Sequence, residues 1–119
     1  MSLTLTPEGG STYRLNASGV MRKAEFEKCQ QQLAREIASH GHVKLLVLLE
    51  RFEGWADADN WSDLSFYMAH GDEIDRIAIV GDEIWRSEAL MFAVADLRRA
   101  PVEFFPTDKM TDARAWLSQ

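Results

Sequence analysis

The sequence has little of what secreted and membrane-spanning proteins usually contain. It has one cysteine, Cys29, so no disulfide can form within the chain, and a lone thiol is typical of a reducing compartment. Its longest purely apolar run, residues 89–95, is too short to span a bilayer. No basic N-terminal segment leads into an apolar run with a small-residue cleavage site. We therefore expect a cytoplasmic protein that is not transmembrane.

Basic residues are scarce relative to acidic ones. Thirteen Lys and Arg stand against 19 Asp and Glu, which gives a formal net charge of −6. Binding to nucleic acid or to an anionic membrane surface draws on clustered positive charge, so the sequence argues against both partners. Glycine and proline are also few, 7 and 3 in 119 residues, and 46% of the residues are hydrophobic. This composition is typical of a globular protein, and we expect a single domain over residues 1–119.

Signatures of common catalytic and nucleotide-binding sites are missing from the sequence. The chain has no Walker loop, no Gly-x-Gly-x-x-Gly fingerprint and no Gly-x-Ser-x-Gly elbow. Cys29 falls on an apolar helical stripe, which predicts a buried and unreactive thiol. We expect no enzymatic activity. Catalysis by His70 together with the carboxylates that follow residue 49 is the remaining alternative.

Two segments resemble metal sites but lack ligands. Residues 57–62 begin like a calcium loop, yet Trp61, Ser62 and Met68 stand where an oxygen ligand, a turn glycine and a bidentate glutamate belong. His40 and His42 have no third ligand nearby in the sequence. We therefore expect no metal and no cofactor.

Apolar periodicity predicts strands and helices that alternate after an N-terminal hairpin. The hairpin pairs residues 3–5 with 13–18; later strands are predicted at 43–49, 76–80 and 101–105, and helices at 22–40, 57–70, 83–99 and 107–117. The resulting order, β-β-α-β-α-β-α-β-α, predicts an α/β fold with a mixed four- to five-stranded sheet and helices packed against it. Strands joined by helices pair in parallel, and the hairpin adds an antiparallel pair.

Capping residues mark some ends of these predicted helices more clearly than others. Gly41 and Gly71 are placed where left-handed C-terminal caps are expected, and Asp82 is a predicted N-cap. Arg98 and Arg99 suit the negative end of a helix over residues 83–99. The first helix has a weak start signal, because no Ser, Thr, Asp or Asn occupies positions 20–24.

Aromatic and apolar side chains exceed what one helix against a sheet can bury. The predicted helix over residues 83–99 is apolar on more than one face, since Trp85, Ala89 and Phe92 form one stripe and other apolar residues spread beyond it. Three outcomes remain open for this surplus. Neighbouring helices absorb it into the core, or it faces a partner subunit, or it lines a ligand cavity.

Several motifs together resemble the SpoIIAA-like family of small bacterial proteins, within the broader STAS and CRAL-TRIO-like group. The likeness rests on Glu53-Gly54-Trp55, then Trp61, Asp63, Phe66 and His70, then residues 76–82 with Trp85, and Trp116-Leu117. It implies a mixed sheet with packed helices, and it implies little about activity. STAS antagonists of anti-sigma factors carry a phosphorylatable Ser or Thr where residues 55–58 here read Trp-Ala-Asp-Ala. Ser62 lies close by without the motif context, so whether it is modified stays open.

The sequence therefore predicts a non-enzymatic STAS-like domain that binds an apolar small molecule or lipid in a regulatory or carrier role. His70 or Tyr67 is expected to orient a polar head. The alternative is a protein-interaction module, a homodimer or a partner-docking surface, formed by Leu90, Met91, Val94 and Leu97. The predicted apolar pocket consists of Trp55, Trp61, Phe66, Tyr67, His70, Trp85, Met91 and Phe92.

Overall fold

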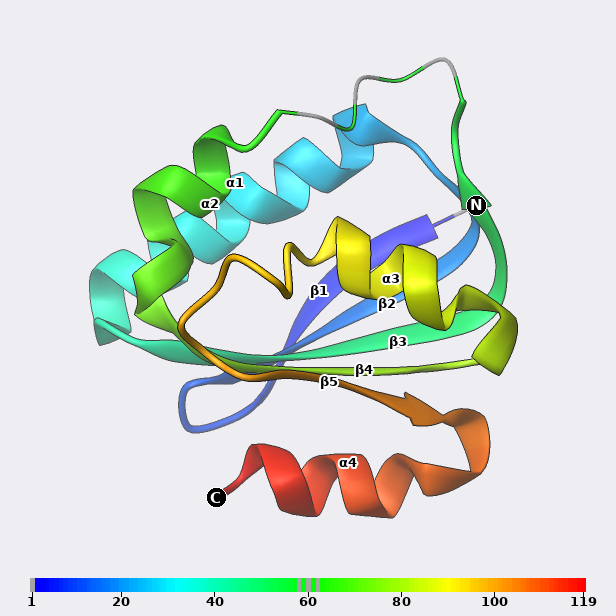
Figure 1. Ribbon diagram of the computed structural model, residues 1–119. Helices are drawn as coiled ribbons and strands as arrows, with labels where there is room; N and C mark the ends of the chain where they lie inside the picture. The colour runs from blue at the N-terminus through cyan, green and yellow to red at the C-terminus, as the bar shows by residue number, and fades with distance from the viewer. Residues whose placement is uncertain (1, 58, 60, 62) are drawn as a thin grey trace.

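The computed structural model describes residues 2–57, 59, 61 and 63–119. Its elements follow the predicted order (Figure 1). The strands are β1 (Ser2–Gly9), β2 (Thr12–Met21), β3 (Val43–Trp55), β4 (Ile74–Gly81) and β5 (Val102–Pro106). The α-helices are α1 (Lys23–His40), α2 (Ser65–His70), α3 (Arg86–Phe92) and α4 (Met110–Leu117), with short 3-10 turns η1 (Gly71–Glu73), η2 (Glu83–Trp85) and η3 (Thr107–Lys109).

The described strands form one five-stranded sheet in the sequential order β1-β2-β3-β4-β5. β1 and β2 pair antiparallel through the hairpin, while β2, β3, β4 and β5 pair in parallel through helical crossovers. The predicted mixed α/β sheet, with an antiparallel hairpin and a parallel second half, is therefore confirmed. No helix in the described ranges is long and apolar enough to cross a membrane.

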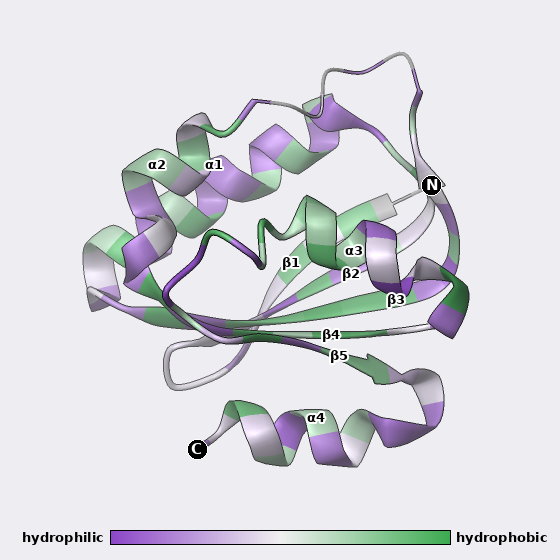
Figure 2. Ribbon diagram, in the orientation of Figure 1, coloured by the Kyte–Doolittle hydropathy of each residue, from purple (hydrophilic) through white to green (hydrophobic). Residues whose placement is uncertain are grey.

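Helices cover both faces of the sheet, which explains why its central strand is an unbroken apolar run. α1, α2 and α3 lie on one face and α4 lies on the other (Figure 1). Leu45 and Val47 of β3 point into the core beneath α1 and α3. Leu46 and Leu48 alternate with them and pack against α4. The central strands are accordingly among the most hydrophobic parts of the chain, whereas polar residues mark the outer side of α1 (Figure 2).

Two helices are shorter than the sequence predicts. The helix expected over residues 57–70 is formed only as α2, and Asp63 precedes it, with its Oδ1 accepting from the Ser65 amide at 3.0 Å. Gly71 does not cap α2 in a left-handed conformation, because its φ is −57° and the chain continues into η1.

The helix expected over residues 83–99 ends at Phe92. Val94 turns the chain with a φ of 58°, a conformation that β-branched residues rarely adopt. The apolar pattern therefore continues past the end of the helix without marking a buried face, since Leu97 after the turn is 62% exposed. The predicted N-cap is confirmed, since the Asp82 side chain accepts from the Ile84 amide at 3.0 Å.

Candidate ligand-binding cavity

An open cavity of about 120 Å³ lies between the sheet and the helices on its α1 face. Strands β1 to β4 supply an aliphatic floor through Leu5, Leu15, Leu45 and Ile74. Helix α1 forms one wall, while α2 and the segment that follows α3 form the opposite one. Aromatic side chains close the remaining sides: Phe26, Trp61, Phe66, Tyr67 and Phe92.

A second, smaller cavity of about 60 Å³ adjoins the first and lies deeper over the sheet. Its floor includes Val47 and Ile79, and α3 covers it through Ala89. The two cavities share the lining residues Leu15, Phe26, Leu45, Phe92 and Arg98. We call them the outer cavity and the inner cavity.

Phe92 is the centre of an aromatic cluster that borders both cavities. Its ring lies 4.9 Å from that of Phe26, 5.3 Å from that of Trp55 and 5.8 Å from that of Trp61, measured between centroids. Trp61 is fixed in this position because its Nε1 donates to the Ala56 carbonyl at 2.9 Å. Tilted and edge-on contacts of this kind hold rings in defined orientations.

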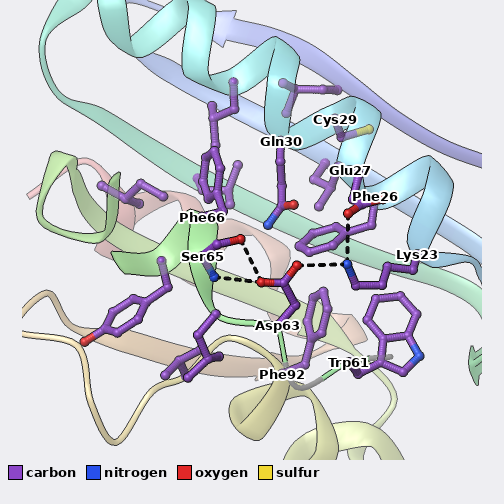
Figure 3. Close-up of a pocket in the computed structure, with 18 of the residues that line it drawn as sticks. Lys23, Phe26, Glu27, Cys29, Gln30, Trp61, Asp63, Ser65, Phe66 and Phe92 are labelled. Atoms are coloured by element: carbon purple, nitrogen blue, oxygen red, sulfur yellow. Dashed lines mark hydrogen bonds and ion pairs between the residues drawn. The ribbon is translucent and has the colours of Figure 1, made fainter. Parts of the chain in front are cut away.

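The mouth of the outer cavity is polar (Figure 3). Lys23 Nζ lies 2.9 Å from a Glu27 oxygen and 3.3 Å from an Asp63 oxygen, and Ser65 Oγ donates to Asp63 at 2.7 Å. Gln30 extends from α1 into the same mouth. The hydrogen bonds to Asp63, of which the one from the Ser65 hydroxyl has the largest effect, lower the pKa of Asp63 to about 2. The pKa of Lys23 is raised, mainly by its hydrogen bond to Glu27. The mouth therefore holds one cation between two carboxylates.

Arg98 lies where the outer and inner cavities meet. Its Nε donates to the Ala93 carbonyl at 2.6 Å, and its guanidinium carbon lies 5.0 Å from the centroid of the Tyr67 ring. The Tyr67 hydroxyl in turn donates to the Leu97 carbonyl at 2.8 Å. These contacts fix the guanidinium between α2 and the end of α3. Burial lowers the pKa of Arg98, since removal of water penalises its charged form.

Two buried nitrogen donors at these cavities have no hydrogen-bond partner in the part of the chain that the structure describes. They are Arg98 Nη1 and Trp55 Nε1. Both residues line the inner cavity, and Arg98 lines the outer one as well. Buried donors are nearly always paired in folded proteins, so each of these needs an acceptor.

The residues predicted for the apolar pocket do not all lie together. Trp61, Phe66, Tyr67 and Phe92 line the outer cavity, and Trp55 joins Phe92 at the inner one. The others fall outside both cavities. Trp85 packs behind the cluster with its ring 5.1 Å from that of Phe52, Met91 is 77% exposed, and His70 turns away to bond Glu73 at 2.8 Å.

Most of the polar lining residues were not predicted as site residues. Lys23 and Glu27 belong to charged stretches that resemble any solvated surface, so the sequence carries no signal for them. Asp63 is one of the residues that carry the family resemblance and one of the carboxylates weighed for catalysis, but it was not predicted as a pocket residue. Arg98 was interpreted as a charge at a helix end, and it does contact the carbonyl of Ala93 just beyond α3. Only the turn at Val94 brings its guanidinium to the cavities.

The other candidate sites of the sequence have ordinary surroundings. Cys29 lies on the buried face of α1 and lines the outer cavity, and burial raises the pKa of its thiol, as the apolar stripe predicts. His42 bonds Asp75 at 2.8 Å. The described residues contain no group of three or more His, Cys, Asp or Glu side chains that could hold a metal ion. Ser62, whose modification the sequence left open, lies outside the described residues.

A mixed five-stranded sheet with an N-terminal hairpin, parallel crossovers and helices on both faces defines a small α/β domain with a cavity under one helical layer. A model of the SpoIIAA-like family matches residues 12–118, so the chain belongs to the SpoIIAA-like family, as its motifs indicate.

The fold is similar to that of an uncharacterized protein from Shewanella loihica PV-4, whose crystal structure has a SpoIIAA-like fold. The TM-score is 0.70 at 21% sequence identity, over 98% of this chain and 92% of that one. At this level of identity the likeness shows the fold alone. No curated protein matches the chain.

Proposed function

We propose that the protein is a non-enzymatic binding domain that holds a small apolar molecule in the outer and inner cavities, in a regulatory or carrier role. The observation that carries this proposal is the cavity pair itself, which has an aliphatic floor, aromatic walls and a polar mouth. Pockets for small ligands usually combine an apolar lining with a few placed polar groups.

The size of the cavities limits the ligand. A dry engineered cavity of roughly 150 Å³ holds benzene, and the outer cavity, at about 120 Å³, is of that order. The ligand that fits is therefore a single ring, a short aliphatic chain or the end of a lipid tail. Each methylene buried there contributes about 0.8 kcal/mol to binding.

The polar groups near the cavities support binding better than catalysis. Asp63 accepts from Ser65 and pairs with Lys23, so its carboxylate is ionised and its oxygens already have partners. His70 bonds Glu73 outside the cavities. The buried Cys29 thiol has a raised pKa, which disfavours the nucleophilic thiolate.

The first test is to recover the ligand and to bind a known probe. Protein purified from cells is compared by native and denaturing mass spectrometry, and we expect one small molecule per chain. Titration of ligand-free protein with 1-hexanol is expected to change tryptophan fluorescence, because Trp61 lines the outer cavity. The proposal fails if no small molecule is recovered and neither 1-hexanol nor hexanoate binds at millimolar concentration.

A matched pair of variants on α1 locates the site. Gln30→Phe places a ring in the mouth and is expected to weaken 1-hexanol binding several-fold. Gln31→Phe adds the same ring at the neighbouring exposed position and is expected to leave binding unchanged. Equal effects of the two variants would place the bound hexanol elsewhere.

The second candidate function is a protein-interaction module, a homodimer or a partner-docking surface. The observation that favours it is the exposure of Met91 and Leu97, at 77% and 62%, beside the cavities. Leu90 and Val94 are half-buried and contribute less to such a surface.

Sedimentation at high protein concentration tests the homodimer. A dimer that Met91→Glu with Leu97→Glu dissociates, and that Met68→Glu leaves intact, would support it. Met68 serves as the control because it is an equally exposed methionine, at 80%, on α2. A monomer at all concentrations would remove the homodimer.

A further inference from the structure

We infer that the ligand of this cavity is a small apolar carboxylate whose head group pairs with the guanidinium of Arg98. This inference rests on the proposed function and adds the chemical class of the ligand. It is carried by the buried and unpartnered Nη1 of Arg98 at the junction of two apolar cavities.

Arg98 carries a charge that its own surroundings do not neutralise. Across the described residues it forms no ion pair, while the nearby carboxylates Glu27 and Asp63 are both engaged by Lys23. Its neighbours are the Ala93 carbonyl, which occupies Nε, and the face of the Tyr67 ring. A guanidinium stays protonated in proteins, so Arg98 is a half-buried cation that lacks an anion, and its Nη1 is buried without a partner.

The geometry around Arg98 suits a planar anion. The contacts of Nε and of the Tyr67 ring fix the plane of the guanidinium before a ligand arrives, so little side-chain freedom is lost on binding. Nη1 remains as the donor without a partner, and Arg98 lines both cavities. A carboxylate oxygen is the acceptor that pairs most strongly with such a donor, through a charge-assisted hydrogen bond.

The walls define the rest of the molecule. Leu15, Leu45 and Phe92 line both cavities, so the part of the ligand next to the head group is in contact with hydrocarbon. Trp55 Nε1, the other unpartnered donor, also lines the inner cavity and offers a neutral hydrogen bond to an oxygen that reaches it. A long or strongly polar ligand fits neither the volume nor the walls.

The test compares two ligands that share a six-carbon chain and differ in the head group. Hexanoate is ionised at pH 7 and 1-hexanol is neutral. We expect hexanoate to bind at least about tenfold more tightly, which is the effect of a hydrogen bond to a charged partner. Equal binding of the two would overturn the inference and leave the proposed function standing. Absence of binding by both would overturn the inference, and it would overturn the proposed function as well if no small molecule is recovered with the purified protein.

Variants then assign the preference to one residue. Arg98→Met keeps the unbranched apolar stem of the side chain and removes the guanidinium with its charge. It is expected to abolish the preference for hexanoate while hexanol affinity changes by less than about threefold. Arg99→Met removes an exposed neighbouring charge and is expected to keep the preference. A preference retained in Arg98→Met would overturn the inference and move the anion site to another cation such as Lys23.

A measurement on the unaltered protein covers the case in which Arg98→Met fails to fold. The Nε–Hε resonance of Arg98 is followed by NMR during both titrations. We expect it to shift with hexanoate and to stay in place with hexanol. A resonance that moves equally with both ligands, or with neither when both bind, would overturn the inference.

Discussion

Asp59 lies at the N-terminus of α1, where its Oδ2 accepts the backbone N–H of Lys23 at 2.9 Å across 36 positions of the chain. The same carboxylate also bonds Nε and Nη2 of Arg22, both at 3.1 Å. No residue next to α1 donates a side-chain cap, since position 22 is arginine. A residue from the segment after β3 therefore supplies the cap that α1 lacks locally.

Removal of this cap is expected to lower the thermal stability of the protein. Asp59→Ala leaves the Lys23 amide without its acceptor, and we expect the melting temperature to fall by a few degrees in calorimetry. Asp59→Asn retains an oxygen acceptor and should recover part of the loss. Asp57→Ala, an exposed residue two positions earlier, is the control. A loss as large in the control would contradict the capping role.

Acid is expected to destabilise the protein through the carboxylates at the mouth and the cap. The pKa of Asp63 is lowered from 3.8 to about 2, first by the Ser65 hydroxyl, and that of Asp59 is lowered first by the Lys23 amide. A lowered folded-state pKa gives stabilisation that is complete above pH 3.8 and is lost as the pH falls toward 2. In urea denaturation, the free energy of unfolding of Asp63→Asn should therefore fall less over that pH range than that of the unaltered protein.

Alkaline pH is expected to act through Tyr13. The side chain of Tyr13 is buried, its hydroxyl donates to Glu36 at 2.7 Å, and this bond together with burial raises its pKa from 10.0 to about 12. The unfolded chain loses this proton first, so the stabilisation is complete below pH 10 and disappears as the pH rises through 12. Tyr13→Phe cannot ionise, and its melting temperature should fall less over this range. Identical alkaline profiles would contradict the assignment.

Gly54 is expected to tolerate no side chain. Its φ is +107°, and a Cβ added there would lie 3.3 Å from Cη2 of Trp85. Gly54→Ala should lower the free energy of unfolding by about 2 kcal/mol, because backbone strain and the displaced ring both act. Gly10→Ala, with a φ of +58° and nothing within 4 Å, should cost about 1 kcal/mol. Urea denaturation that ranks the two variants in the opposite order would contradict this explanation.

The Cys29 thiol is expected to be protected in the folded protein. It lies on the buried face of α1, and its pKa is raised by burial. Reaction with a disulfide reagent such as DTNB should be at least about a hundredfold slower in buffer than in denaturant. A folded protein that reacts as fast as the denatured one would show that the thiol is accessible.

The sequence by itself determined the order of the elements and the pairing of the strands. Apolar side chains in the central strand leave no solvated face, so helices had to cover both sides, and helices between strands impose parallel pairing. The alternation of Leu45 and Leu46 between the two cores follows directly from this pattern. The spacing of apolar residues alone likewise predicted that Cys29 lies on the buried face of α1.

Tertiary structure decided where the helices end and which side chains share a cavity. The cap of α1 comes from Asp59, and the end of α3 depends on the turn at Val94, neither of which local spacing records. Because that turn replaces a last helical segment, Arg98 reaches both cavities. Periodicity shows that a side chain prefers burial, but the partner that it meets depends on how the chain runs between elements. That path sets the position of Arg98, whose buried Nη1 has no partner among the described residues.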